Sequence, residues 1–127
     1  MLKSQHLILL TLLISVLSSQ ACSSSSTGTA TYSQSYDTVF QSSLSAAGAL
    51  SWEVKVVDKE SGFIQAKVPL NWRTFSNLVT IEIARRETSI TTVRVSSTAP
   101  HVFDWGKNSS NVKLFLDKLD ALAGPRY

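Results

Sequence analysis

The stretch SWEVKVVDKESGFIQAKV, residues 51–68, decides the fold class of this 127-residue chain. Its first half places Trp52, Val54 and Val56 at alternate positions, which is typical of a strand with one buried face. The sequence DKESG then favours a turn, because its glycine accepts a positive φ. Alternation resumes over residues 63–68, so the stretch predicts an antiparallel hairpin.

A second hairpin follows at residues 78–97. Val79, Ile81 and Ile83 alternate in its first strand, the sequence RRETS forms the turn, and the return strand keeps the same period. The other face of both hairpins is polar and of mixed sign, which predicts a solvated face. Its members are Glu53, Lys55, Gln65, Lys67, Thr80, Glu82, Thr92 and Arg94. Cross-strand pairing of Glu82 with Arg94 is expected on this face.

Helical periodicity flanks the hairpins on both sides. Apolar side chains recur at three- and four-residue steps over residues 36–50 and again from about Asn111, where Gly124 and the following proline end the pattern. The candidate caps are Ser33 or Ser35 for the first helix and Ser109 or Ser110 for the second. The order helix, four strands, helix therefore predicts one α+β domain at residues 35–127. We expect a four-stranded antiparallel sheet with both helices on one face.

Residues 1–21 have the three parts of a secretory signal peptide. They carry one positive charge at Lys3, an apolar run over residues 7–17 and a small polar exit. The run is shorter than the roughly 20 residues that a membrane-spanning helix needs. A retained membrane or amphipathic helix is the alternative interpretation.

Cys22 is the single cysteine and directly follows this leader. A single cysteine excludes a disulfide within the chain. The residue opens a Ser/Thr/Gly run that has nothing to bury, and the edge of a leader offers no dependable base or helix terminus to activate a thiolate. An exported free thiol is also prone to oxidation. These arguments favour covalent attachment of lipid at Cys22.

The leader followed by SSQAC resembles the signal and lipobox of bacterial lipoproteins. The resemblance implies cleavage before Cys22, a diacylglycerol on this residue and usually an N-acyl chain. It also implies an outer-membrane, periplasm-facing location, because Ser23 stands where aspartate would retain the protein in the inner membrane. Ser19 departs from the usual leucine, and residues 19–21 also fit an ordinary signal-peptidase site. A soluble secreted or periplasmic protein is therefore the alternative.

Residues 22–34 are predicted to be a flexible tether, because serine, threonine and glycine bury little. A dozen such residues give an r.m.s. span of roughly 20 Å. The layout of residues 39–119 is similar to that of small bacterial lipoproteins of uncharacterised function, a resemblance that implies no active residues.

No catalytic residue, metal site or cofactor is predicted. His101 is the one histidine outside the leader, and together with Asp104 it falls short of the three or four ligands of a zinc site. A G-x-S-x-G elbow and phosphate-binding loops are absent from the sequence. Without Lys3 the chain carries 11 basic and 9 acidic residues, a balance that disfavours nucleic acid as a partner. A hydrolase that uses His101 is the least favoured function.

Four aromatic residues in the predicted loops are the candidate partner-binding residues: Trp72, Phe75, Phe103 and Trp105. Aromatic side chains in loops either cover the core or anchor contacts. With an anchor and no catalytic signature, the sequence favours a non-enzymatic accessory or scaffolding subunit of a cell-envelope assembly. The expected partners are the membrane and other envelope proteins. A periplasmic binding module for a small apolar or lipidic ligand is the alternative.

Overall fold

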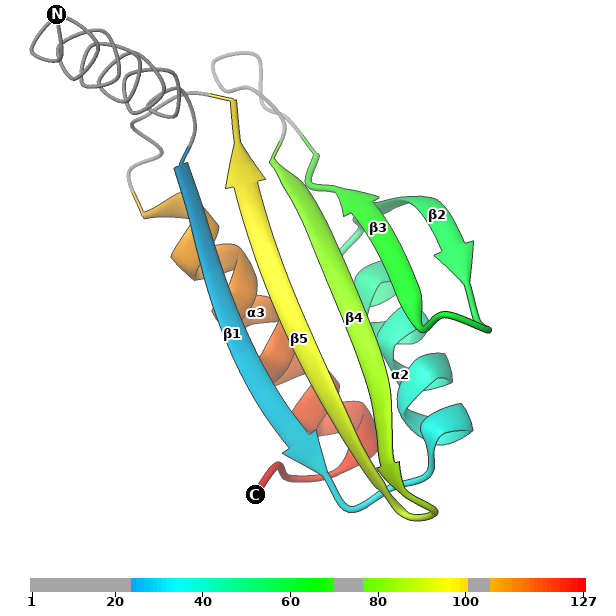
Figure 1. The fold of residues 1–127 in the computed structure, drawn as a ribbon. Coiled ribbons are helices and arrows are strands. Elements are labelled where there is room, and N and C mark those ends of the chain that lie inside the picture. Colours follow the sequence, from blue (N-terminus) through cyan, green and yellow to red (C-terminus); the bar gives the residue numbers. More distant parts are fainter. Residues whose placement is uncertain (1–23, 70–76, 101–105) are drawn as a thin grey trace, which may run out of the picture.

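The computed structural model describes residues 24–69, 77–100 and 106–127. Figure 1 shows a curved sheet with helices packed behind it. The elements, in chain order, are β1 (Ser24–Tyr32), α2 (Tyr36–Ala49), β2 (Glu53–Asp58), β3 (Phe63–Lys67), β4 (Leu78–Glu87), β5 (Ile90–Ala99) and α3 (Lys107–Ala123). The two helices contact each other and cover the same face of the sheet, as predicted (Figure 1).

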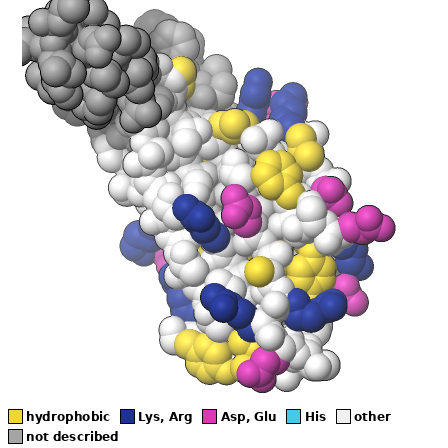
Figure 2. All heavy atoms as spheres, in the orientation of Figure 1, with side chains coloured by type: hydrophobic (Ala, Val, Ile, Leu, Met, Phe, Trp, Pro, Cys, Tyr) yellow, Lys and Arg dark blue, Asp and Glu magenta, His cyan; other side chains and the backbone are white. Residues whose placement is uncertain are grey.

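The sheet has five antiparallel strands in the order β1-β5-β4-β3-β2. Both predicted hairpins are present, β2–β3 and β4–β5, and they lie side by side through β3 and β4. Glu82 lies opposite Arg94 in the second hairpin, so the two residues are cross-strand neighbours, as predicted. The open face of the sheet mixes both signs of charge with many uncharged side chains (Figure 2).

The prediction of four strands is wrong, because β1 adds a fifth at the edge of the sheet. The prediction of a flexible tether over residues 22–34 is wrong for Ser24–Tyr32, all of which pairs with β5. The inward-facing residues of this strand are mostly small, so the strand lacks the alternation of large apolar residues that reveals a strand in a sequence. Its backbone hydrogen bonds to β5 and its contacts with α3 hold it instead.

Close packing between β1 and α3 explains the small residues of β1. A Cβ on Gly28 would lie 2.6 Å from Val112 Cγ1 and 3.3 Å from Leu116 Cδ1. Only a residue without a side chain lets α3 approach the strand this closely. The small residues of β1 are therefore explained by the close packing of α3 against this strand.

The helix boundaries follow local chemistry. Ser35 caps α2, and its hydroxyl oxygen accepts from the Thr38 backbone N–H at 3.3 Å. Helix α3 begins at Lys107, earlier than predicted, so Ser109 and Ser110 lie within the helix and do not cap it. Gly124, with a φ of 95°, follows the last residue of α3, as predicted.

The core lies between the sheet and the helices. Trp52 stacks on Phe115 with ring centroids 5.8 Å apart, which joins the start of β2 to α3. The predicted burial of Val54 and Val56 is wrong, since their side chains are 36% and 41% exposed. Strand β2 is one of the two edge strands, a bulge between these two valines shifts its register, and all six of its residues are exposed. In the described ranges no helix combines the length and the apolar character that crossing a membrane requires.

Candidate functional site

A cleft of about 550 Å³ opens where three elements meet at one end of the fold. The first turn of α2, the β2–β3 turn and the end of β4 form its walls. The lining residues are Tyr36, Asp37, Lys59, Glu60, Ser61, Ile83, Ala84 and Arg85. A smaller hollow of about 290 Å³ shares Tyr36, Asp37 and Arg85 and extends to Ser35 and Thr88.

Gly62 holds the β2–β3 turn against β4. Its φ is 74°, and its carbonyl oxygen accepts from the Ile83 backbone N–H at 2.7 Å. A Cβ at this position would lie 2.0 Å from the Ile83 carbonyl oxygen, so glycine is required both by conformation and by space. The Asp58 carboxylate accepts from the Glu60 backbone N–H at 3.1 Å and from that of Ser61 at 3.4 Å. Hydrogen bonding to Ser61 lowers the pKa of Asp58.

Tyr36 is the centre of the cleft. Its hydroxyl donates to the Lys59 carbonyl oxygen at 2.5 Å, and its ring stacks on Phe40 with centroids 5.9 Å apart. The Arg85 guanidinium carbon lies 5.1 Å from the Tyr36 ring centroid, a cation–π contact. Burial raises the pKa of the Tyr36 phenol, and the positive charge of Arg85 opposes this.

The charges of the cleft are of both signs. Lys59 Nζ lies 3.2 Å from Asp37 Oδ1, an ion pair between two exposed side chains. Lys59 is thus paired with a carboxylate, whereas the contact of Arg85 in the cleft is with the Tyr36 ring. The arrangement suits a ligand that has both an apolar part and a charged group. Because the Tyr36 hydroxyl already donates its proton to a backbone carbonyl, it is poorly placed to act as an acid.

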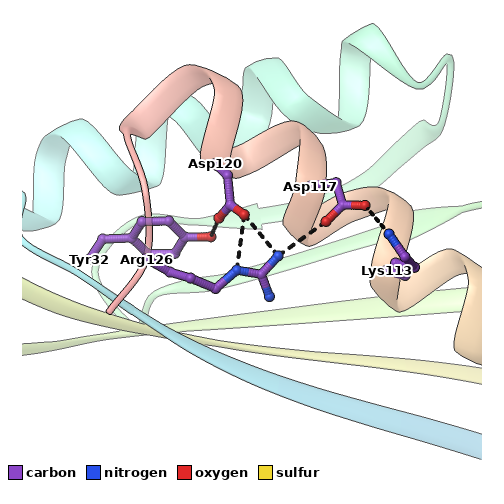
Figure 3. A network of polar contacts seen from close by, with 5 residues as sticks. All are labelled: Tyr32, Lys113, Asp117, Asp120 and Arg126. Carbon is purple, nitrogen blue, oxygen red and sulfur yellow. Dashed lines mark hydrogen bonds and ion pairs between the residues drawn. The ribbon is translucent and has the colours of Figure 1, made fainter.

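A second group of polar residues ties the chain end to β1 and α3 (Figure 3). The buried Tyr32 hydroxyl donates to Asp120 Oδ1 at 2.7 Å, and Arg126 Nε donates to Asp120 Oδ2 at 2.9 Å. Arg126 also reaches Asp117, which is paired with Lys113 at 2.5 Å. Burial and the hydrogen bond to Asp120 raise the pKa of Tyr32. Because the Tyr32 side chain is buried, we interpret these bonds as structural contacts that hold β1, α3 and Arg126 together.

A third polar group is buried under the start of α3. Asn77 Nδ2 and Ser97 Oγ both donate to Asn108 Oδ1, at 2.9 Å and 2.8 Å. Asn108 Nδ2 donates to Ser24 Oγ at 3.1 Å, and Asn111 Nδ2 donates to Ser97 Oγ at 3.1 Å. These bonds fasten the start of α3 to the first residue of β1, and they satisfy polar groups that would be costly to bury alone.

The residues singled out in the sequence lie outside the described residues. They are Cys22, Trp72, Phe75, His101, Phe103, Asp104 and Trp105. Across the described ranges there is no group of three or more His, Cys, Asp or Glu side chains that could hold a metal ion. The cleft was not foreseen, because Tyr36 appears in the sequence only as part of an apolar helix face and Arg85 only as the end of a hairpin.

No family model and no curated protein matches the chain. Solved structures do match its fold. An uncharacterized protein from Bacillus thuringiensis has a TM-score of 0.57 and 14% identity over 79% of this chain and 96% of that chain. Ara h 8.0201 has a TM-score of 0.57 and 7% identity over 79% of this chain and 97% of that chain. A conserved protein of unknown function from Enterococcus faecalis has a TM-score of 0.51 and 11% identity over 79% of this chain and 71% of that chain.

These likenesses concern the fold. Over its described residues the chain is an α+β protein with two helices and a five-stranded antiparallel sheet, a fold similar to that of these solved structures.

Proposed function

We propose that this chain is a lipoprotein, anchored to the outer membrane through Cys22, which serves as a non-enzymatic accessory subunit of a cell-envelope assembly. The supporting observation is the position of Cys22 between a signal-like leader and the fold. The described structure starts with β1 at Ser24, so cleavage before Cys22 would remove no described strand or helix. A cut there would leave the whole domain attached to the anchor.

The intact mass of the mature protein tests the anchor. We expect a chain that starts at Cys22 and carries the added mass of a diacylglycerol and an acyl chain. Cys22→Ser is expected to abolish this addition and to release the protein from the membrane fraction, since two or three acyl chains anchor firmly. An unmodified mass for the wild-type chain would contradict the proposal.

Co-purification tests the accessory role. Described residues near the ends of the two segments that contain the candidate aromatics lie close together. The Val68 backbone N–H donates to the Asn77 carbonyl oxygen at 3.0 Å, and Asn77 Nδ2 donates to Asn108 Oδ1 at 2.9 Å. We expect envelope partners to be retained by the native protein and lost with Trp72→Ala or Trp105→Ala at unchanged stability. Retention of the same partners by both variants would contradict the role of these aromatics.

A periplasmic binding module is the second candidate, and the cleft around Tyr36 favours it. A ligand that binds only the folded state raises Tm with its concentration by mass action. Screening amphipathic anions against the wild type and Arg85→Ala would test this function. A shift that is present in the wild type and absent in the variant supports ligand binding at the cleft. Equal shifts would place binding elsewhere.

A further inference from the structure

The first residue of the described fold lies very close to the proposed anchor. Ser24 is already paired with Ala99 in the sheet, and its hydroxyl accepts from Asn108 Nδ2 at 3.1 Å. Two residues of extended chain span at most about 7 Å. The connection from Cys22 to the start of β1 therefore has a reach of at most about 7 Å, whereas a flexible tether of a dozen residues has a reach of roughly 20 Å.

We infer that the lipoprotein stands on its membrane with one defined end of the sheet, called here the anchor end, facing the lipid headgroups. The anchor end comprises the starts of β1, β2 and β4, the ends of β3 and β5, and the start of α3. The inference rests on the proposed lipidation of Cys22 and adds an orientation to it. The register brings these strand ends together, with Ser24 opposite Ala99 and Lys67 opposite Leu78.

Helix α3 runs along β1 from the anchor end toward the opposite end of the sheet. Its second residue, Asn108, bonds Ser24, and Ser109 Oγ lies 3.3 Å from Ser26 Oγ at the start of β1. Its last turns lie at the other end of the strand, where Asp120 accepts from the Tyr32 hydroxyl. A ten-residue strand such as β5 spans about 30 Å. The β4–β5 turn at Thr88 and Ser89 therefore stands far from the anchor end (Figure 1).

The described residues of the anchor end carry a small excess of positive charge. Exposed Lys67 and Lys107 mark the anchor end, and Glu53, opposite Lys67, is its acidic residue among those described. The other described acidic residues lie in the middle or far half of the fold. They are Asp37, Asp58, Glu60, Glu82, Glu87, Asp117 and Asp120. Cations such as Lys59, Arg85 and Arg126 accompany these carboxylates, so the orientation rests on the short connection to Cys22. Lys67 and Lys107 add a local attraction to anionic headgroups.

The orientation has a consequence for partners. The cleft around Tyr36 lies at the far end, between the start of α2, the β2–β3 turn and the end of β4. It would open away from the membrane that holds the anchor. A soluble ligand or a partner in the aqueous compartment could reach it without displacing the domain from the lipid surface.

Headgroup quenching tests the orientation. The full chain, processed in its host, is reconstituted in vesicles of phosphatidylethanolamine and phosphatidylglycerol that contain headgroup-nitroxide lipids. A fluorophore is attached to a cysteine introduced by Lys107→Cys or, as the matched control, by Thr88→Cys; both native side chains are exposed. Lipidation blocks the Cys22 thiol, so only the introduced cysteine is labelled. We expect several-fold stronger quenching at position 107 than at position 88.

A second variant separates the short connection from any other cause of orientation. About 12 glycine and serine residues inserted between Ser23 and Ser24 restore a reach of roughly 20 Å. The difference in quenching is expected to shrink in this variant. Equal quenching at the two positions in the protein of native length overturns the orientation, while a lipidated intact mass leaves the anchor standing. An unmodified mass overturns both.

Discussion

Gly28 lies where α3 crosses β1, and the space for its side chain is already filled by Val112. Gly28→Val is therefore expected to destabilise the domain by about 1–3 kcal/mol, the usual cost of overpacking, although valine is the better strand former. Urea unfolding measures the loss. Thr29→Val is the matched control, because Thr29 is exposed on the same strand, and its change should stay within about 0.5 kcal/mol. Equal midpoints for the two variants would contradict this packing argument.

Tyr32 makes stability depend on pH in the alkaline range. Its pKa is raised in the folded state by burial and by Asp120, whereas an unfolded tyrosine titrates near about 10. The folded state thus binds more protons above pH 10, so this contribution to stability is complete below about pH 10 and is lost as the pH rises further. Tyr32→Phe is expected to flatten the decline in the free energy of unfolding measured from about pH 9 to pH 11. An equal decline for the wild type and Tyr32→Phe would contradict this role of Tyr32.

At the scale of elements, β1 is the strand whose order is most easily measured. Its pairing with β5 predicts that alternate amides of Ser24–Tyr32 exchange slowly with deuterium, because at an edge strand only every second N–H points into the sheet. Residue-resolved exchange by NMR would detect this alternation. Uniformly fast exchange over residues 24–32 would instead indicate the flexible tether that their composition suggests.

The hairpins could be predicted because large aliphatic residues such as Ile81 and Val93 alternate with polar ones, and this pattern has one structural solution. Strand β1 could not be predicted in this way. Its Gly28 and Ala30 are small residues, and α3 packs closely against Gly28. The local sequence around β1 does not indicate this long-range contact. The start of α3 was missed for a related reason: its first turn is polar, so apolar periodicity begins only at Val112.

The cleft was beyond prediction from sequence for a different reason. Tyr36 and Arg85 are 49 positions apart in the sequence, and they meet only because the Gly62 carbonyl accepts from Ile83 and fixes the β2–β3 turn beside the end of β4. The turn itself and its glycine were predicted correctly. What the sequence lacks is the partner of the turn, which depends on the order of strands in the sheet.

At the scale of the whole molecule, the two edges of the sheet differ. Strand β2 is exposed along all six residues. Residues 126 and 127 instead lie along part of β1. Arg126 forms an isolated β-bridge with Tyr32, and the Tyr127 backbone N–H donates to the Thr31 carbonyl oxygen at 3.0 Å. The Arg126 guanidinium also lies 2.8 Å from Asp120 Oδ2, beside the buried Tyr32 hydroxyl. Residues 126 and 127 therefore connect β1, an edge strand, to α3 through backbone hydrogen bonds and an ion pair.

Removing residues 125–127 should eliminate these contacts with β1 and α3 and destabilise the domain without unfolding it. We expect a loss of about 1–3 kcal/mol in the free energy of unfolding, because Asp120 loses a charge-assisted partner at a site only about a third exposed. Amide exchange should accelerate most around Tyr32, the part of β1 that the chain end covers. Tyr127→Ala keeps the backbone N–H that bonds Thr31 and serves as the control, with a change within about 0.5 kcal/mol. A truncated chain with the urea midpoint of the full chain would show that these contacts contribute nothing to stability.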